Sequence, residues 1–213
     1  MRPRPLGEGA VACRDGDGTH EGWGLARRFD EAGTDALFVV PQLAFLERSG
    51  SPGRFAEEGR FRAFVEEMLG ALRARRRSLA RVESVALLAH SAGFETALAL
   101  IARGGLAIDA VVLFDALYRG VPPFTEWVAA APGRRLVSLH TGGGRTASQS
   151  RMLAARARER LGAQAVAEGE GGSLPELVRA RRVVIARSPA PHGGVPARHI
   201  PELLGALGLS ARP

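Results

Sequence analysis

Short apolar runs alternate with longer amphipathic stretches along the chain, and this alternation limits the folds open to it. Runs of four to eight apolar residues bounded by turn residues predict buried strands, and the stretches between them have helical spacing. Strands that alternate with helices predict a parallel sheet with helices on both faces. The sequence therefore predicts an α/β fold, a three-layer sandwich with a mostly parallel sheet of about six strands. The predicted strands are GAVAC (9–13), DALFVVP (35–41), SVALLA (84–89), AIDAVVLFD (107–115), RRLVSLHT (134–141) and RRVVIARS (181–188).

The amphipathic stretches predict six helices, several of which end at glycine. They are WGLARRFDEAG (23–33), GRFRAFVEEMLGALRARRRSLA (59–80), AGFETALALIARGG (92–105), TEWVAAAP (125–132), SQSRMLAARARERLG (148–162) and HIPELLGALG (199–208). Two polar, glycine-rich stretches, RDGDGTHEG (14–22) and AEGEGGS (167–173), have loop composition. A chain of 213 residues, 46% of them hydrophobic, is long enough for one sizeable core, so we predict a single domain over residues 1–213.

Charge and terminal composition bear on partners and location. The net charge is +7, and every basic residue is an arginine, a bias typical of GC-rich bacterial genomes. The densest run, RARRRSLAR (73–81), has no interleaved aromatic residue, which favours a solvated helix end over a nucleic-acid patch. The start, MRPRPLGEGAVAC, lacks the apolar run of a signal peptide, and no stretch approaches the length of a membrane span. We expect a cytoplasmic protein with no nucleic-acid or membrane partner.

One serine lies between a predicted strand and a predicted helix, where a parallel sheet gathers its reactive groups. Ser91 occupies the turn AHSAG (89–93). A tight turn that presents a hydroxyl needs small residues two positions before and after it, and Ala89 and Gly93 satisfy this requirement. Such a turn also directs the first amides of the helix towards a developing oxyanion. The sequence is compatible with a nucleophile here, or with a serine that caps an ordinary helix.

The strand VALLA, the turn AHSAG and the helix FETALALIA resemble the nucleophile elbow of the α/β-hydrolase family, with alanine in place of the usual first glycine. The resemblance implies a serine hydrolase whose nucleophile, acid and base follow in that order. On this basis Asp115, directly after an apolar strand, is the candidate acid, because the next strand ends without a carboxylate; its alternative role is a helix cap. His192, in the loop after the last strand, is the candidate base, and His199 is the alternative.

The resemblance also implies an oxyanion hole and a substrate pocket. One amide is expected from Ala92 and the second from the loop after an early strand, where Gly16 lies but the family's frequent His-Gly pair is absent. No inserted lid is evident, and the loop SGSPGRF (49–55) is expected at the pocket rim. The candidate substrate-binding residues are His90, Tyr118, Phe124 and Trp127, of which the last three have ordinary packing as their alternative role.

The expected function follows from these residues. We expect an esterase that acts on a small-molecule acyl substrate through an acyl-enzyme on Ser91, with amidase chemistry close behind because one triad serves both reactions. No metal or organic cofactor is implied, and Cys13 has no metal-ligand partner nearby. The loop HTGGGRTAS (140–148) could hold an anion, but it lacks the ending of a P-loop. The alternative to an enzyme is a catalytically inactive binding or scaffold protein with this fold.

Overall fold

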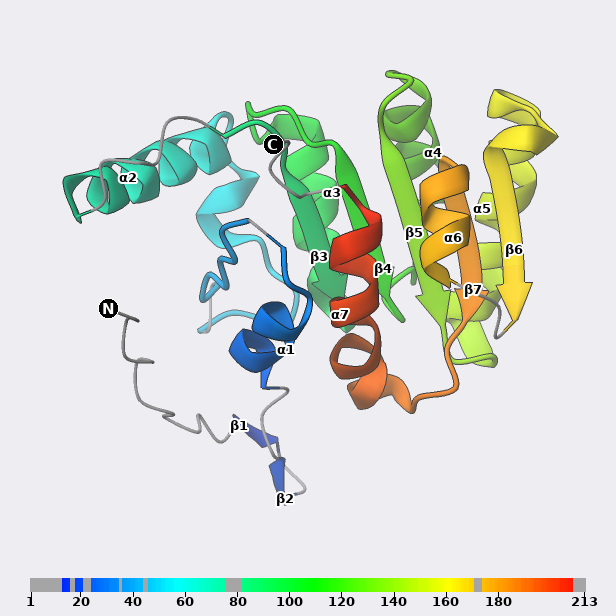
Figure 1. Cartoon of the computed structure of the whole chain (residues 1–213), viewed down its shortest axis with the longest axis horizontal. Helices are drawn as coiled ribbons and strands as arrows, with labels where there is room; N and C mark the ends of the chain where they lie inside the picture. Colours follow the sequence, from blue (N-terminus) through cyan, green and yellow to red (C-terminus); the bar gives the residue numbers. More distant parts are fainter. Residues whose placement is uncertain are drawn as a thin grey trace.

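The structure is a computed structural model. A parallel sheet of five strands forms its centre (Figure 1). The order across the sheet is β3-β4-β5-β7-β6. The strands are β3 (Ala86–His90), β4 (Ala110–Phe114), β5 (Arg135–His140), β6 (Val166–Glu170) and β7 (Val183–Arg187), and a separate antiparallel pair consists of β1 (Cys13–Asp15) and β2 (Gly18–His20). The residues described are 13–15, 18–20, 24–34, 36–43, 46–75, 82–170 and 174–208.

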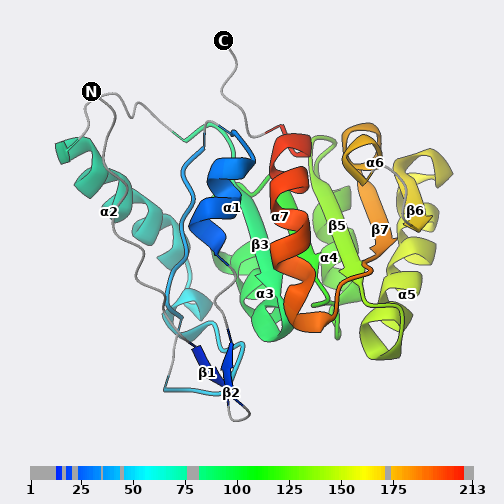
Figure 2. The same ribbon diagram turned by 60° about the horizontal axis from the view of Figure 1, so that its bottom comes forward.

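Helices cover both faces of this sheet, as the alternating pattern predicted (Figure 2). One face packs against α3, α4 and α5, and the other against α1, α6 and α7. The helices are α1 (Leu25–Glu31), α2 (Arg60–Arg75), α3 (Phe94–Arg103), α4 (Val121–Ala129), α5 (Gly144–Leu161), α6 (Leu174–Ala180) and α7 (Val195–Ala206). Four short 3-10 turns are η1 (Gly53–Ala56), η2 (Ser91–Gly93), η3 (Ala163–Ala165) and η4 (His192–Gly194). Among the described helices, none is long and apolar enough to cross a membrane.

Strand β4 shows how the sequence produces the two cores. All five of its residues are buried, and successive side chains point to opposite faces of the sheet. Val111 and Leu113 therefore join the core under α3, α4 and α5, whereas Val112 and Phe114 join the core under α6 and α7. The run AVVLF is apolar throughout because a central strand of a doubly covered sheet needs apolar side chains on both faces.

Two strand and loop predictions were wrong. The run 35–41 was predicted as a strand, but its described residues, 36–41, have no regular structure and pair with no described strand. Leu37 and Val40 are 47% and 62% exposed, so these apolar side chains are not buried in the sheet. An apolar segment forms a strand only where a neighbouring strand pairs with its backbone. The stretch 167–173 was predicted as a loop, but Val166–Glu170 forms the edge strand β6 beside β7. A strand pairs through backbone groups, so the polar and small residues of this stretch do not prevent pairing with β7. The missing side chain of Gly169 leaves room for Leu177.

Smaller differences concern the ends of elements and the number of strands. The predicted loop 14–22 contributes to the β1–β2 hairpin, α4 and α7 begin four residues earlier than predicted, and α6 was not predicted. The main sheet has five strands in the described part of the chain, where about six were predicted. The helix after Ser91 and the strands on either side of Asp115 are confirmed.

Candidate active site

Four neighbouring strands end at one edge of the sheet, and the candidate site residues follow them. The ladder pairs His90 with Phe114, Phe114 with Leu139 and His140 with Arg187. The residue after each strand therefore lies at the same edge, which brings Ser91, Asp115, Thr141 and Ser188 into one row. Parallel strands concentrate polar groups at this edge because each strand there gives way to a loop or helix.

Ser91 begins the turn η2, between β3 and α3, with a left-handed backbone. Its φ is 52°, one of two positive values at non-glycine residues in the described chain. A Cβ at Gly93 would lie 3.7 Å from the Cβ of Ala89, so the two small residues that the spacing singled out face each other across the turn. A left-handed serine costs about 1–3 kcal/mol, and such strain collects at functional sites.

Asp115 is the other non-glycine residue with a positive φ, 44°, and its side chain is 5% exposed. Its carboxylate accepts hydrogen bonds from the Thr141 amide at 3.3 Å, the Thr141 hydroxyl at 3.0 Å and the Thr146 hydroxyl at 2.5 Å. Burial alone would raise the pKa of Asp115, but the bonds from Thr146, His192 and Thr141 outweigh it and hold the pKa below its ordinary value. Asp115 is therefore an ionised group fixed in one orientation.

His192 approaches this carboxylate from the loop between β7 and α7. Its Nδ1 lies 2.7 Å from Oδ2 of Asp115, and 44% of its side chain is exposed. Because an ionised carboxylate only accepts, Nδ1 carries the proton, and in the neutral ring Nε2 is the basic nitrogen. The predicted acid and base are thus bonded to each other. The Ser91 hydroxyl makes no hydrogen bond to any described residue, His192 included.

His90 supports the same loop from the strand that precedes Ser91. Its Nε2 lies 3.0 Å from the carbonyl oxygen of His192, and the two rings are 4.6 Å apart between centroids. Burial lowers the pKa of His90, so its ring favours the neutral state. In that state Nε2–H donates to the carbonyl. His90 contacts the candidate base rather than Asp115, which suits a supporting role better than that of a base.

Residues 47–51 form a neighbouring wall that contacts the turn at Ser91. A Cβ on Gly50, whose φ is +84°, would come within 2.4 Å of the Ala92 oxygen, so only glycine permits this approach. Glu95, in the first turn of α3, binds Arg48 through both guanidinium nitrogens and Arg119 at 3.1 Å. These contacts, which the sequence pattern did not reveal, bring together Arg48, Arg119 and Glu95 from three distant segments. The wall borders a hollow of about 400 Å³ lined by Gln42, Leu43 and residues 47–51.

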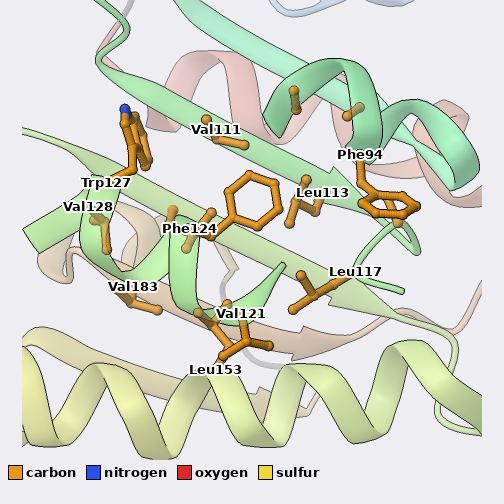
Figure 3. Close-up of a cluster of buried hydrophobic side chains, with 14 of the residues drawn as sticks. Phe94, Val111, Leu113, Leu117, Val121, Phe124, Trp127, Val128, Leu153 and Val183 are labelled. Carbon is orange, nitrogen blue, oxygen red and sulfur yellow. The ribbon is translucent and has the colours of Figure 1, made fainter. Parts of the chain in front are cut away.

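The remaining predicted residues divide between the site and the core. Ala92 follows Ser91 in η2, and Tyr118, which is partly exposed, lies against Phe94 with ring centroids 5.9 Å apart. Phe124 is completely buried and Trp127 is 7% exposed, so the structure places both in the core rather than on a pocket wall. Figure 3 shows them beside Val111 and Val128 in that core. Gly16 lies outside the described residues.

His199, the alternative base, lies on the buried side of α7 and does not contact Asp115. Its Nε2 is 2.8 Å from the Ser188 hydroxyl, and its Nδ1 is 2.5 Å from Glu202. Both ring nitrogens are therefore occupied, and the side chain is 8% exposed. Of the two histidines in this segment, only His192 has a ring nitrogen bonded to Asp115.

The described residues contain no group of three or more His, Cys, Asp or Glu side chains placed to hold a metal ion. Compared with protein-family models, with curated proteins and with solved structures, the chain matches none. The functional argument therefore depends on the geometry of the site.

Proposed function

We propose that the protein is a serine hydrolase that cleaves carboxylic esters through an acyl-enzyme on Ser91. The observation that carries the proposal is the hydrogen bond of His192 Nδ1 to buried, ionised Asp115, at the end of the strand next to Ser91. The left-handed backbone at Ser91 supports it further, because a strained strand-to-helix turn presents a nucleophile.

In the proposed reaction, Ser91 Oγ attacks the ester carbonyl while His192 Nε2 takes the hydroxyl proton. Asp115 keeps the proton of the ring on Nδ1 and stabilises the imidazolium that forms. The tetrahedral intermediate then collapses: the bond to the leaving oxygen breaks, and His192 returns the proton to that oxygen. Water attacks the acyl-enzyme in the same manner, with His192 as base, and frees the acid and Ser91.

The amide of Ala92 is the proposed donor to the oxyanion. It lies in η2, which leads directly into α3, and the first amides of a helix have no partner within the helix. Gly16 is the second donor that the family resemblance implies. Residues 47–51, held against Ala92 through Gly50, form one side of the proposed acyl site.

The alternative is a binding or scaffold protein in which Ser91 does not react. The absence of a hydrogen bond from the Ser91 hydroxyl to His192, among the residues described, is the observation in its favour. Catalytic hydrogen bonds are often long before substrate arrives, so this absence is compatible with the serine hydrolase as well.

Hydrolysis of chromogenic esters tests the proposal. Short- and medium-chain p-nitrophenyl esters and the matching p-nitroanilides are compared on the unaltered protein and on Ser91→Ala. We expect ester turnover that the substitution abolishes, and faster cleavage of esters than of anilides. Equal rates for the two proteins would contradict the proposal, and faster anilide cleavage would make the protein an amidase instead.

A further inference from the structure

A second serine, histidine and carboxylate are joined behind the candidate site. Ser188 follows β7 directly, and His199 and Glu202 lie on α7. The Ser188 hydroxyl is 2.8 Å from His199 Nε2, and His199 Nδ1 is 2.5 Å from Glu202 Oε1. Ser188 and His199 are 2% and 6% exposed, so substrate does not reach them.

The protons in this group can be assigned from what each atom is able to do. The Glu202 carboxylate accepts, so His199 Nδ1 donates to it. The Ser188 hydroxyl has no other acceptor among the described residues, so it donates to His199 Nε2. The Ser188 oxygen in turn accepts the amide of Ala190 at 3.2 Å. The Ser188 hydroxyl and both ring nitrogens of His199 thus have partners, in a series of hydrogen bonds from the Ala190 amide to Glu202.

A hydrogen bond within this group joins the two ends of the segment that carries His192. Ser188 lies before the loop 189–194 and His199 lies after it, and the backbone amide of Ser188 also donates to the His140 carbonyl at 2.8 Å. His192 itself contacts Asp115 and the His90 ring, and 44% of its side chain is exposed. The orientation of this exposed ring therefore depends on how firmly the two ends of its loop are held.

We propose that Ser188, His199 and Glu202 form a positioning network that holds the loop 189–194 so that His192 Nδ1 stays on Asp115. The inference rests on the proposed function, because it assigns these three residues to the orientation of the proposed base. None of them touches the reacting atoms, and His199 is a positioning residue. Misplacing a catalytic group by about 1 Å can cost roughly 100-fold in rate.

Two substitutions of His199 test this network. His199→Leu keeps the approximate volume and removes both hydrogen bonds, whereas His199→Gln keeps an acceptor for Ser188 and a donor for Glu202. We expect Leu to lower kcat about 10- to 100-fold with KM little changed, and Gln to restore most of the rate. The matched control is Ser150→Ala, which breaks the buried bond between Ser138 and Ser150 and should leave kcat unchanged.

A second readout does not depend on turnover. The Nδ1 proton of His192, hydrogen-bonded to Asp115, should give a downfield proton resonance that Asp115→Asn removes. We expect this resonance to weaken or shift in His199→Leu and in Ser188→Ala, and to persist in His199→Gln and Ser150→Ala. An unchanged resonance and unchanged kcat in folded His199→Leu would overturn the inference. Failure of the proposed function looks different, since the unaltered protein would then lack turnover while the resonance still reported on the network.

Discussion

The protein contains two groups of a serine, a histidine and a carboxylate, and they differ in what surrounds them. The outer group consists of Ser91, His192 and Asp115. Its histidine is exposed, its serine has a left-handed backbone, and its serine and carboxylate follow neighbouring strands. In the inner group, which consists of Ser188, His199 and Glu202, the serine and the histidine are buried and hydrogen-bonded, and only the carboxylate reaches the surface. Its hydrogen bonds run without a break from serine to carboxylate, yet its buried serine has no access to substrate.

Under the proposed function, this difference means that residue types and hydrogen bonds alone do not identify a reactive site. A nucleophile needs a hydroxyl that substrate can reach, and a base needs one ring nitrogen that is free to take a proton. Ser91 and His192 meet these conditions. The hydrogen-bonding groups of Ser188 and His199 instead bind each other and Glu202, and in our proposal they hold the loop 189–194. The assignment makes distinct predictions for the two groups.

The largest contrast should come from neutralising each carboxylate. Asp115→Asn removes the charge that keeps the His192 proton on Nδ1, and we expect kcat/KM for an ester to fall about 10³- to 10⁴-fold. Glu202→Gln makes the same change of charge in the inner group, but the glutamine oxygen still accepts from His199, so we expect a change below about tenfold. Steady-state kinetics on the two folded variants measures the contrast. Equal losses would mean that the two groups are not distinguished as we propose.

The pKa of Asp115 gives the next largest effect. Thr146→Val removes a hydrogen bond to the carboxylate and should destabilise the fold by about 1.5–3 kcal/mol at neutral pH. Because the folded-state pKa of Asp115 is depressed, its ionisation stabilises the fold above the ordinary value of 3.8 and this stabilisation is lost as pH falls below it. The substitution raises that folded-state pKa, so Asp115 contributes less stability at neutral pH and less of it is lost on acidification.

Thr125→Val is the matched control for this pH dependence. The Thr125 hydroxyl is equally buried but donates to the backbone carbonyl of Val121, which does not titrate. Urea unfolding between pH 3 and 8 should show a difference from the unaltered protein that shrinks at acid pH for Thr146→Val and stays constant for Thr125→Val. Parallel curves for both variants would contradict the role assigned to Thr146.

The smallest predicted effect concerns the two serines and the free energy of unfolding. Ser91→Gly relieves a left-handed backbone and should stabilise the fold by about 1 kcal/mol while it abolishes turnover. Ser188→Ala leaves the buried Nε2 of His199 without its donor and should destabilise by about 1–3 kcal/mol. The urea midpoint of unfolding should therefore rise in Ser91→Gly and fall in Ser188→Ala. A loss of stability in Ser91→Gly would show that its backbone is not strained.

Sequence reasoning predicted the local features of the candidate site that neighbouring residues determine. The small residues around Ser91 fix a turn, and Asp115 follows a strand that is apolar on both faces; both features are readable within a dozen residues. The central strands were predicted for the same reason. The run 35–41 failed because an apolar segment becomes a strand only beside a partner, which periodicity does not supply.

Contacts between distant segments were not predictable from one sequence. The threonine bonds to Asp115 cross 26 and 31 positions, and Gly50 meets Ala92 only after the chain has folded. The position of His192 in the loop after the last strand favoured it over His199, but the bond of its Nδ1 to Asp115 is seen only in the structure. Phe124 and Trp127 resembled pocket residues by composition, but α4 turns both into the core.

The reactivity of Ser91 is the central claim, and covalent labelling tests it most directly. The unaltered protein is treated with a fluorophosphonate probe, digested and analysed by mass spectrometry to locate the modified residue. We predict modification at Ser91 and none at Ser188, lost in Ser91→Ala and strongly reduced in His192→Ala. Labelling that persists in Ser91→Ala, or an unaltered protein that takes up no probe, would contradict the account.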